Sequence, residues 1–199
     1  MSEILAFNKW TVEGIAVKDP GLAKYISLSP KIVPMTGGKY AGNKFHKSRV
    51  FIVERLINRL MVSGHKSKKH KMSSGHNTGK NNKAMSIVIK AFEIIEKKLN
   101  KNPIEVFVKA IENSAPREEI ITIEYGGARY PKPVEVSPQR RVDIVLKFIT
   151  QGTYQKCFNK KKSAETALAE EIINAYEMNQ TSSIIQKKLE LERQADASR

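Results

Sequence analysis

The sequence has little cysteine, no long apolar run and no histidine in its second half. The single cysteine among 199 residues, Cys157, excludes an internal disulfide framework and is typical of proteins from a reducing cytosol. No stretch approaches the roughly 18 apolar residues of a membrane-spanning helix, and the first residues lack the basic start and long apolar middle of a signal peptide. We therefore expect no membrane partner and a buried, structural thiol at Cys157, beside Phe158.

Acidic residues are nearly absent from one segment of the chain. Residues 39–83 contain twelve lysines and arginines and a single acid, Glu54. The whole chain carries a formal net charge of +15. Such an excess favours binding to a polyanion. Lysines and glycines without an evident base-reading arrangement favour recognition of nucleic acid by its shape and its phosphate backbone more than by its sequence.

Hydrophobic periodicity predicts about six amphipathic helices. Asn102 and Ser137 each precede a proline, and we expect both to cap the helices that follow. The predicted helical ranges are 48–64, 83–99, 102–114, 137–149, 163–178 and 182–195.

Residues 118–136 predict a β-hairpin instead. The stretch "EIITIE" is rich in β-branched residues, Gly126-Gly127 permits a tight reversal, and Pro131 and Pro133 confine the return strand to an edge. An isolated two-stranded ribbon is at best marginally stable. The hairpin could therefore fold flat on its own helices, or protrude as an arm whose tyrosines and cations meet a partner, and its aromatic and basic tip favours the arm.

Two further segments lack a helical or strand pattern. Residues 1–44 contain the turn signals Asp19-Pro20-Gly21 and Gly37-Gly38 and no sustained period, which predicts an extended N-terminal arm. Residues 65–83 form a basic, low-complexity loop whose composition builds no core. The predicted fold is thus mainly α: a bundle of about six helices spanning 45–199, with the loop 65–83, the protruding hairpin 118–136 and a basic arm, 1–44.

Sites for catalysis or cofactors are not indicated. The stretch "GHNTGK", residues 75–80, has three residues between its glycines, and Asn81 stands where a phosphate loop needs Ser or Thr. The histidines lack the cysteine or carboxylate partners of a zinc site. They are His46, His65, His70 and His76. We expect no metal, no cofactor and no enzymatic activity. A nucleotide-dependent enzyme would rest on "GHNTGK" alone, and a free-standing nucleic-acid-binding regulator is the other alternative.

Several motifs carry a resemblance across essentially the whole chain. They are "VKDPGLAKYI" (17–26), "IVERLINRLM" (52–61), "NTGKNN" (77–82), "NPIEVFVKAIENSAPREE" (102–119), "YGGARYPKPVEVSPQRRVD" (125–143) and the C-terminal "LAEEIINAY…IIQKKLELERQADASR". In this order the motifs resemble the small-ribosomal-subunit protein seven family in its archaeal and eukaryotic form, and most closely its archaeal branch.

The resemblance implies a helical bundle with a protruding hairpin that binds the 3′ major (head) domain of small-subunit rRNA and helps nucleate head assembly. Its implied rRNA-binding residues are Lys44, Lys47, Arg49, Arg55, Arg59, Gly79, Lys80, Lys83, Arg117, Arg140 and Arg141. The hairpin tip implied to approach exit-site tRNA and mRNA comprises Tyr125, Gly126, Gly127, Arg129, Tyr130 and Lys132. The other implied partners are neighbouring ribosomal proteins of the head and platform, in the cytoplasm. The glutamates Glu118, Glu119 and Glu124 argue against phosphate contacts along the first strand.

Overall fold

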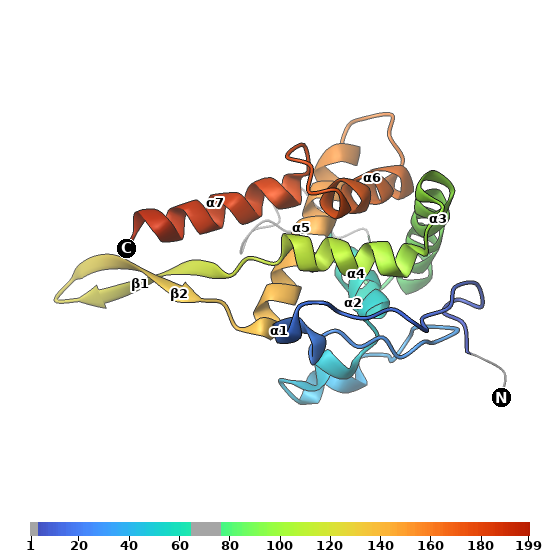
Figure 1. Ribbon diagram of the computed structural model, residues 1–199, viewed down its shortest axis with the longest axis horizontal. Coiled ribbons are helices and arrows are strands. Elements are labelled where there is room, and N and C mark those ends of the chain that lie inside the picture. The colour runs from blue at the N-terminus through green and yellow to red at the C-terminus, as the bar shows by residue number, and fades with distance from the viewer. Residues whose placement is uncertain (1–3, 65–76) are drawn as a thin grey trace.

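The computed structural model describes residues 4–64 and 77–199. Within them lie seven α-helices, two 3-10 turns and one antiparallel hairpin, which confirms the predicted mainly helical fold (Figure 1). The helices are α1 (Pro20–Ala23), α2 (Ile52–Leu60), α3 (Asn81–Leu99), α4 (Pro103–Ser114), α5 (Pro138–Cys157), α6 (Ala164–Tyr176) and α7 (Ser183–Ala197). The turns are η1 (Lys39–Gly42) and η2 (His46–Arg49), and the strands are β1 (Glu118–Tyr125) and β2 (Ala128–Glu135).

The core is formed where helices α2 to α6 meet. Its fully buried side chains include Phe51, Phe92, Phe107, Ile149 and Leu168. Burying a side chain of this size contributes about 1.5–3 kcal/mol, so these contacts fix the helices on which the charged surface is built. None of the described helices is long and apolar enough to cross a membrane.

The N-terminal segment packs on the helices of its own chain. Trp10 is 5% exposed and lies edge-on to Phe92, with ring centroids 5.7 Å apart, while its indole Nε1 donates to Glu96 at 2.9 Å. Leu22 of α1 is fully buried. Glu54, the only acid in the basic segment, is buried on α2 and accepts a hydrogen bond from the backbone N–H of Thr36 at 2.8 Å. The acid therefore fastens the arm to the bundle.

The hairpin protrudes from the bundle, and α7 runs beside it (Figure 1). Its strands pair from Glu118–Glu135 to Tyr125–Ala128, and both turn glycines have positive φ, which the tight reversal requires. The end of the hairpin nearest the bundle, the hairpin foot, is held by the C-terminal helix α7. Arg199 pairs with Glu118, and the backbone N–H of Arg117 donates to Glu192 at 3.2 Å.

A buried carboxylate that the sequence pattern did not reveal holds α7 in place. Glu171 on α6 has no exposed surface and pairs with Lys156 of α5 at 2.8 Å. The hydroxyls of Ser182 and Ser183 donate to it at 3.1 Å each. A Cβ on Gly152 would lie 2.2 Å from the Ser183 hydroxyl oxygen, so any side chain there would displace that hydroxyl from its position beside Glu171.

Local predictions were met unevenly. The Asn102 side chain caps α4 by accepting from the Ile104 N–H at 3.0 Å, as predicted. Helix α5 begins at Pro138 as predicted, but it extends to Cys157, beyond the predicted range 137–149. The Ser137 side chain makes no capping bond, so its predicted cap is wrong. Helix α3 begins at Asn81, and the predicted loop 65–83 therefore ends too late; residues 65–76 of it lie outside the described residues.

The predicted burial of the Cys157 thiol is also wrong. Cys157 is half-buried at the end of α5, and its Sγ lies 3.6 Å from the carbonyl oxygen of Ser163. The neighbouring Phe158 is itself 44% exposed. Partial burial still raises the pKa of the thiol, because desolvation disfavours the thiolate.

Candidate nucleic-acid interface

A groove of about 800 Å³ runs between the turns η1 and η2, helix α2 and the first half of α5. Five of the predicted rRNA-binding cations line it, together with Lys147, which sequence reasoning missed. The groove cations are Lys44, Lys47, Arg55, Arg59, Arg140 and Lys147. Among the described residues that line it, the only acid is Asp143, so six positive charges minus one negative charge give these side chains a formal charge of +5.

Lys147 had a recognisable signal in the sequence. It stands seven residues after Arg140 on a predicted helix, and residues two turns apart share one helix face. Once Arg140 is assigned to a charged surface, Lys147 is expected on the same side of α5.

Asp143 forms ion pairs with two of the groove cations, Lys47 and Arg55. One carboxylate oxygen accepts from the Arg55 guanidinium at 2.9 Å, and the other pairs with Lys47. The Arg55 side chain is only 5% exposed and also donates to the carbonyl oxygen of Tyr25 at 2.9 Å. Arg55 therefore holds the arm, α2 and α5 together beneath the groove, and supports the surface from below.

The remaining groove cations are available to a ligand. Among the described residues, Lys44, Arg59 and Lys147 form no ion pair with a carboxylate, and Lys44 is exposed. Next to the groove, Arg49 and Lys39 line a second open depression of about 660 Å³. Unpaired cations along a continuous groove attract a phosphate backbone and release its counterions on binding.

The arginine pair at the start of α5 is divided between two environments. Arg140 lines the groove, is 58% exposed on its side chain, and makes a bidentate pair with Glu119 of β1 at 2.6 and 2.8 Å. This hydrogen-bonded pairing raises the pKa of the Arg140 guanidinium. Arg141 points elsewhere: it donates to the carbonyl oxygen of Pro116 and to Asp19, each at 3.1 Å, and is 12% exposed.

Other predicted residues lie apart from the groove. Gly79, with φ of +74°, precedes the N-terminus of α3, where Lys80 and Lys83 line a separate pocket near the end of α5. Arg117 lies at the hairpin foot in a cleft of mixed charge beside α7. The structure thus brings together five of the predicted rRNA-binding residues and distributes the others around the bundle.

The hairpin tip is open to solvent. Tyr125 is 81% exposed and Tyr130 is 57% exposed. Arg129 pairs across the strands with Glu124 at 3.6 Å, and Lys132 lies opposite Ile121. Exposed aromatic rings beside cations are suited to stacking on unpaired bases. No group of His, Cys, Asp or Glu that could hold a metal ion occurs in residues 4–64 and 77–199.

Comparison of the sequence with known proteins identifies the family of this chain. The family model described as ribosomal protein S7p/S5e matches residues 22–199. The chain is 52% identical over 193 residues to the small ribosomal subunit protein uS7 of Nanoarchaeum equitans, covering 97% of this chain and 98% of the relative.

Two further relatives carry the same name. The chain is 48% identical over 189 residues to uS7 of Methanothermobacter thermautotrophicus, covering 95% of this chain and 96% of the relative. It is 46% identical over 197 residues to uS7 of Archaeoglobus fulgidus, covering 99% and 96%. These matches confirm the predicted archaeal resemblance, and the relatives carry the name of a ribosomal protein and not of an enzyme. The chain belongs to the ribosomal protein S7p/S5e family, the structural proteins of the small ribosomal subunit known as uS7.

Proposed function

We propose that this protein binds the 3′ major (head) domain of small-subunit rRNA through the groove between η1, η2, α2 and α5, and helps nucleate assembly of the subunit head. The observation that carries the proposal is the convergence of six cations on one groove with a single acid. That acid is held between Lys47 and Arg55, so it positions cations more than it repels phosphates. Binding of this kind reads the shape and backbone of RNA.

The hairpin serves a different purpose in the same proposal. Its tip reaches the tRNA exit site and the mRNA exit channel, where Tyr125 and Tyr130 stack on nucleotides and Arg129 and Lys132 lie beside their phosphates. The support is the exposure of the tyrosines at the end of a braced arm. The proposed location is the small ribosomal subunit in the cytoplasm, among the neighbouring proteins of head and platform.

The test is binding of the purified protein to a 3′-domain rRNA fragment and to an unrelated RNA of equal length, across a salt series. We expect a preference of roughly tenfold or more that survives moderate salt, because a shaped site adds contacts to the non-specific electrostatic attraction. Equal affinities that collapse together with salt would contradict a shaped rRNA site. A free-standing regulator would in addition wash off ribosomal subunits sedimented in high salt.

A further inference from the structure

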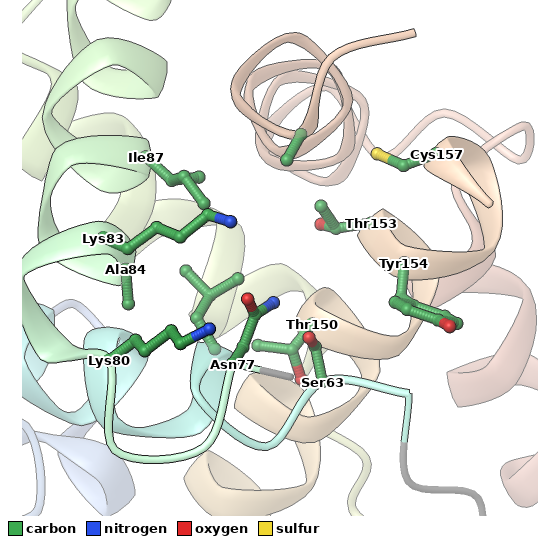
Figure 2. A pocket seen from close by; sticks show the side chains of 12 residues that line it. Ser63, Asn77, Lys80, Lys83, Ala84, Ile87, Thr150, Thr153, Tyr154 and Cys157 are labelled. Carbon is green, nitrogen blue, oxygen red and sulfur yellow. The ribbon is translucent and has the colours of Figure 1, made fainter. Parts of the chain in front are cut away.

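An open cleft separate from the groove lies at the hairpin foot, between the start of α1, the end of α4, the start of α5 and α7 (Figure 1). Its volume is about 730 Å³, which leaves room for several residues of an extended chain. The pocket between α3 and α5 that Figure 2 shows has a volume of about 70 Å³ and holds only about two waters. Of these two openings, the cleft alone can receive part of another macromolecule.

The charged residues that line the cleft nearly balance one another. Five cations and four acids give a formal charge of +1 to the described lining: Lys18, Lys109, Arg117, Arg141 and Lys188 against Asp19, Glu112, Glu118 and Glu135. Three of the four acids are already paired with cations of the same chain. These pairs are Asp19–Arg141 at 3.1 Å, Glu112–Lys109 at 3.1 Å and Glu118–Arg199. The cleft therefore differs from the groove, where cations greatly outnumber acids.

Three cations of the cleft have no carboxylate partner within the described part of the chain. Lys18 and Arg117 are exposed, and Lys188 is half-buried. The Lys188 ammonium donates to the carbonyl oxygen of Asn113 at 2.8 Å, at the end of α4. This bond holds the ammonium at the cleft wall and leaves two of its three donors. Desolvation lowers the pKa of Lys188, and Arg117 adds to the effect, while Glu192 opposes it from beyond ion-pair distance. A carboxylate in the cleft would stabilise this charged ammonium.

The cleft also has an apolar side, on which Met178 is the most exposed residue. Met178 is 59% exposed, has φ of +55° and directly follows the C-cap of α6. Glycine is the usual residue at this left-handed position, because a Cβ there crowds the following carbonyl. A long apolar side chain thus stands where the fold favours none, in a cleft that Val136 and Pro138 also line. The flexible thioether is suited to packing on an apolar side chain of a partner.

A nucleic-acid strand matches this cleft poorly. The strand carries a negative charge at every nucleotide, so its phosphates would meet Glu118 and Glu135 as well as the unpaired cations. Such like-charge contacts select against the wrong partner. A protein segment can instead place one carboxylate, one apolar side chain and neutral backbone at separate points. The mixture of charges and apolar surface therefore favours a protein.

We propose that the cleft docks an extended, acidic segment of a neighbouring protein in the small ribosomal subunit. A carboxylate of the segment lies beside Lys188 and Arg117, and an apolar side chain of the segment packs on Met178. This inference rests on the proposed function, since it gives a surface and a chemistry to the protein neighbours expected there. It also assigns Arg117, which the family resemblance implied as an rRNA contact, to a protein partner.

Carbodiimide coupling tests for the carboxylate directly. In small subunits that carry the full chain, the carbodiimide activates a carboxylate, and a lysine amine in contact with it forms an amide and releases a urea. We expect peptide mapping by mass spectrometry to find an amide between Lys188 and an Asp or Glu side chain of a second protein. Lys188→Arg keeps the positive charge without the reactive amine, so this variant should lose the cross-link. An amide to Glu192 of the same chain alone would overturn the inference.

A photoreactive group at position 178 separates a protein partner from RNA. A benzophenone side chain introduced in place of Met178 bonds to either class of molecule on illumination. We expect it to bond to the protein segment that Lys188 reaches. Bonding to rRNA alone, or no cross-link by either method, would overturn the inference.

The cross-linked segment, made as a synthetic peptide, is then titrated onto the full chain bound to the 3′-domain rRNA fragment. Lys188→Met should weaken peptide binding about tenfold, as one charge-assisted bond is lost. Lys187→Met is the matched control on α7, because Lys187 pairs with Glu190 and does not line the cleft. This control should change the affinity by less than about twofold.

Met178→Gly separates docking from folding. Glycine relieves the left-handed backbone at this position, so the midpoint of thermal unfolding should stay the same or rise. The affinity of the peptide should nevertheless fall about threefold, because an apolar contact is removed. A methionine with only a structural role would not show these opposite changes.

The outcomes distinguish this inference from the proposed function. Equal peptide affinities of the Lys188→Met variant and the unchanged protein would overturn the docking site, even with the preference for the rRNA fragment intact. Loss of any preference for the fragment in the unchanged protein would instead refute the proposed function, whatever the cleft binds.

Discussion

The groove and the hairpin have formal charges of opposite sign. The groove gathers six cations around one acid, and that acid lies between two of the cations. Residues 118–135 of the hairpin contain four glutamates against Arg129 and Lys132, which gives a formal charge of −2. Two regions of one basic protein therefore differ in sign, although they meet at Arg140.

The difference separates two kinds of contact with RNA. The groove gains from counterion release and so should supply most of the salt-dependent affinity. Three of the four hairpin glutamates pair with arginines of the same chain: Glu118 with Arg199, Glu119 with Arg140, and Glu124 with Arg129. What the hairpin leaves for a partner is its tyrosines, which recognise unpaired bases by stacking.

The largest expected effect comes from removing cations from the groove. Lys44→Ala combined with Arg59→Ala should weaken binding of the 3′-domain fragment about a hundredfold, as two charge-assisted contacts are lost. The slope of log affinity against log salt should fall by about 1.8, at about 0.9 for each phosphate. Both quantities are measured by titration at several salt concentrations.

The matched control removes the same charge from the hairpin. Arg129→Ala combined with Lys132→Ala should leave the salt slope of the fragment unchanged, since these cations lie at the tip, away from the groove lining. If the hairpin pair lowered the slope as much as the groove pair, affinity would follow net charge alone, and the distinction between the two regions would be lost.

A smaller effect, on the stability of the folded protein, is expected when two groove arginines that lie one helical turn apart are replaced in turn. Arg55→Met should lower the free energy of unfolding by about 2 kcal/mol, because the buried guanidinium makes charge-assisted bonds to Asp143 and to the Tyr25 carbonyl. Arg59→Met should change it by only about 0.5 kcal/mol, as a surface change. Urea denaturation of the RNA-free protein measures both, and equal losses would show that Arg59 is also structural.

The smallest effect on rRNA binding should come from the hairpin tip. Replacing residues 123–130 by Asn-Gly keeps a tight turn, leaves Thr122 paired with Pro131 as in the native register, and removes both exposed tyrosines. Fragment affinity should change by about twofold or less, since charges farther away than about 10 Å are screened at 0.1 M salt. Subunits carrying the variant should assemble but release exit-site tRNA at an altered rate. A collapse of fragment affinity would instead place a main rRNA contact on the hairpin.

Much of the fold followed from local patterns. Apolar residues at helical spacing predicted α2 to α7, and the Gly126-Gly127 turn between β-branched and proline-containing runs predicted the hairpin. The errors occurred where a local signal competes with tertiary contacts. Ser137 has the identity of a cap but makes no capping bond, and Cys157 is left half-buried because α5 ends beside a pocket.

The candidate site was predictable in composition and only partly in arrangement. The run of cations without acids between residues 39 and 83 indicated a polyanion, and five of the predicted residues do line one groove. Two of those five, Lys47 and Arg55, are paired with Asp143, whose partner Arg55 lies 88 residues away in sequence. A local sequence pattern cannot predict an ion pair between residues so far apart in the chain.

By itself, the sequence determined the helical class, the position of the hairpin, the excess of positive charge and the motifs that mark the family. These properties depend on neighbouring residues and on composition. Only the tertiary structure decided which cations are free. Consecutive helical residues project about 100° apart, so Arg140 reaches the groove while Arg141 is enclosed by Asp19 and Pro116. Whether a cation meets RNA or stabilises the fold depends on the acids and carbonyls that folding brings beside it.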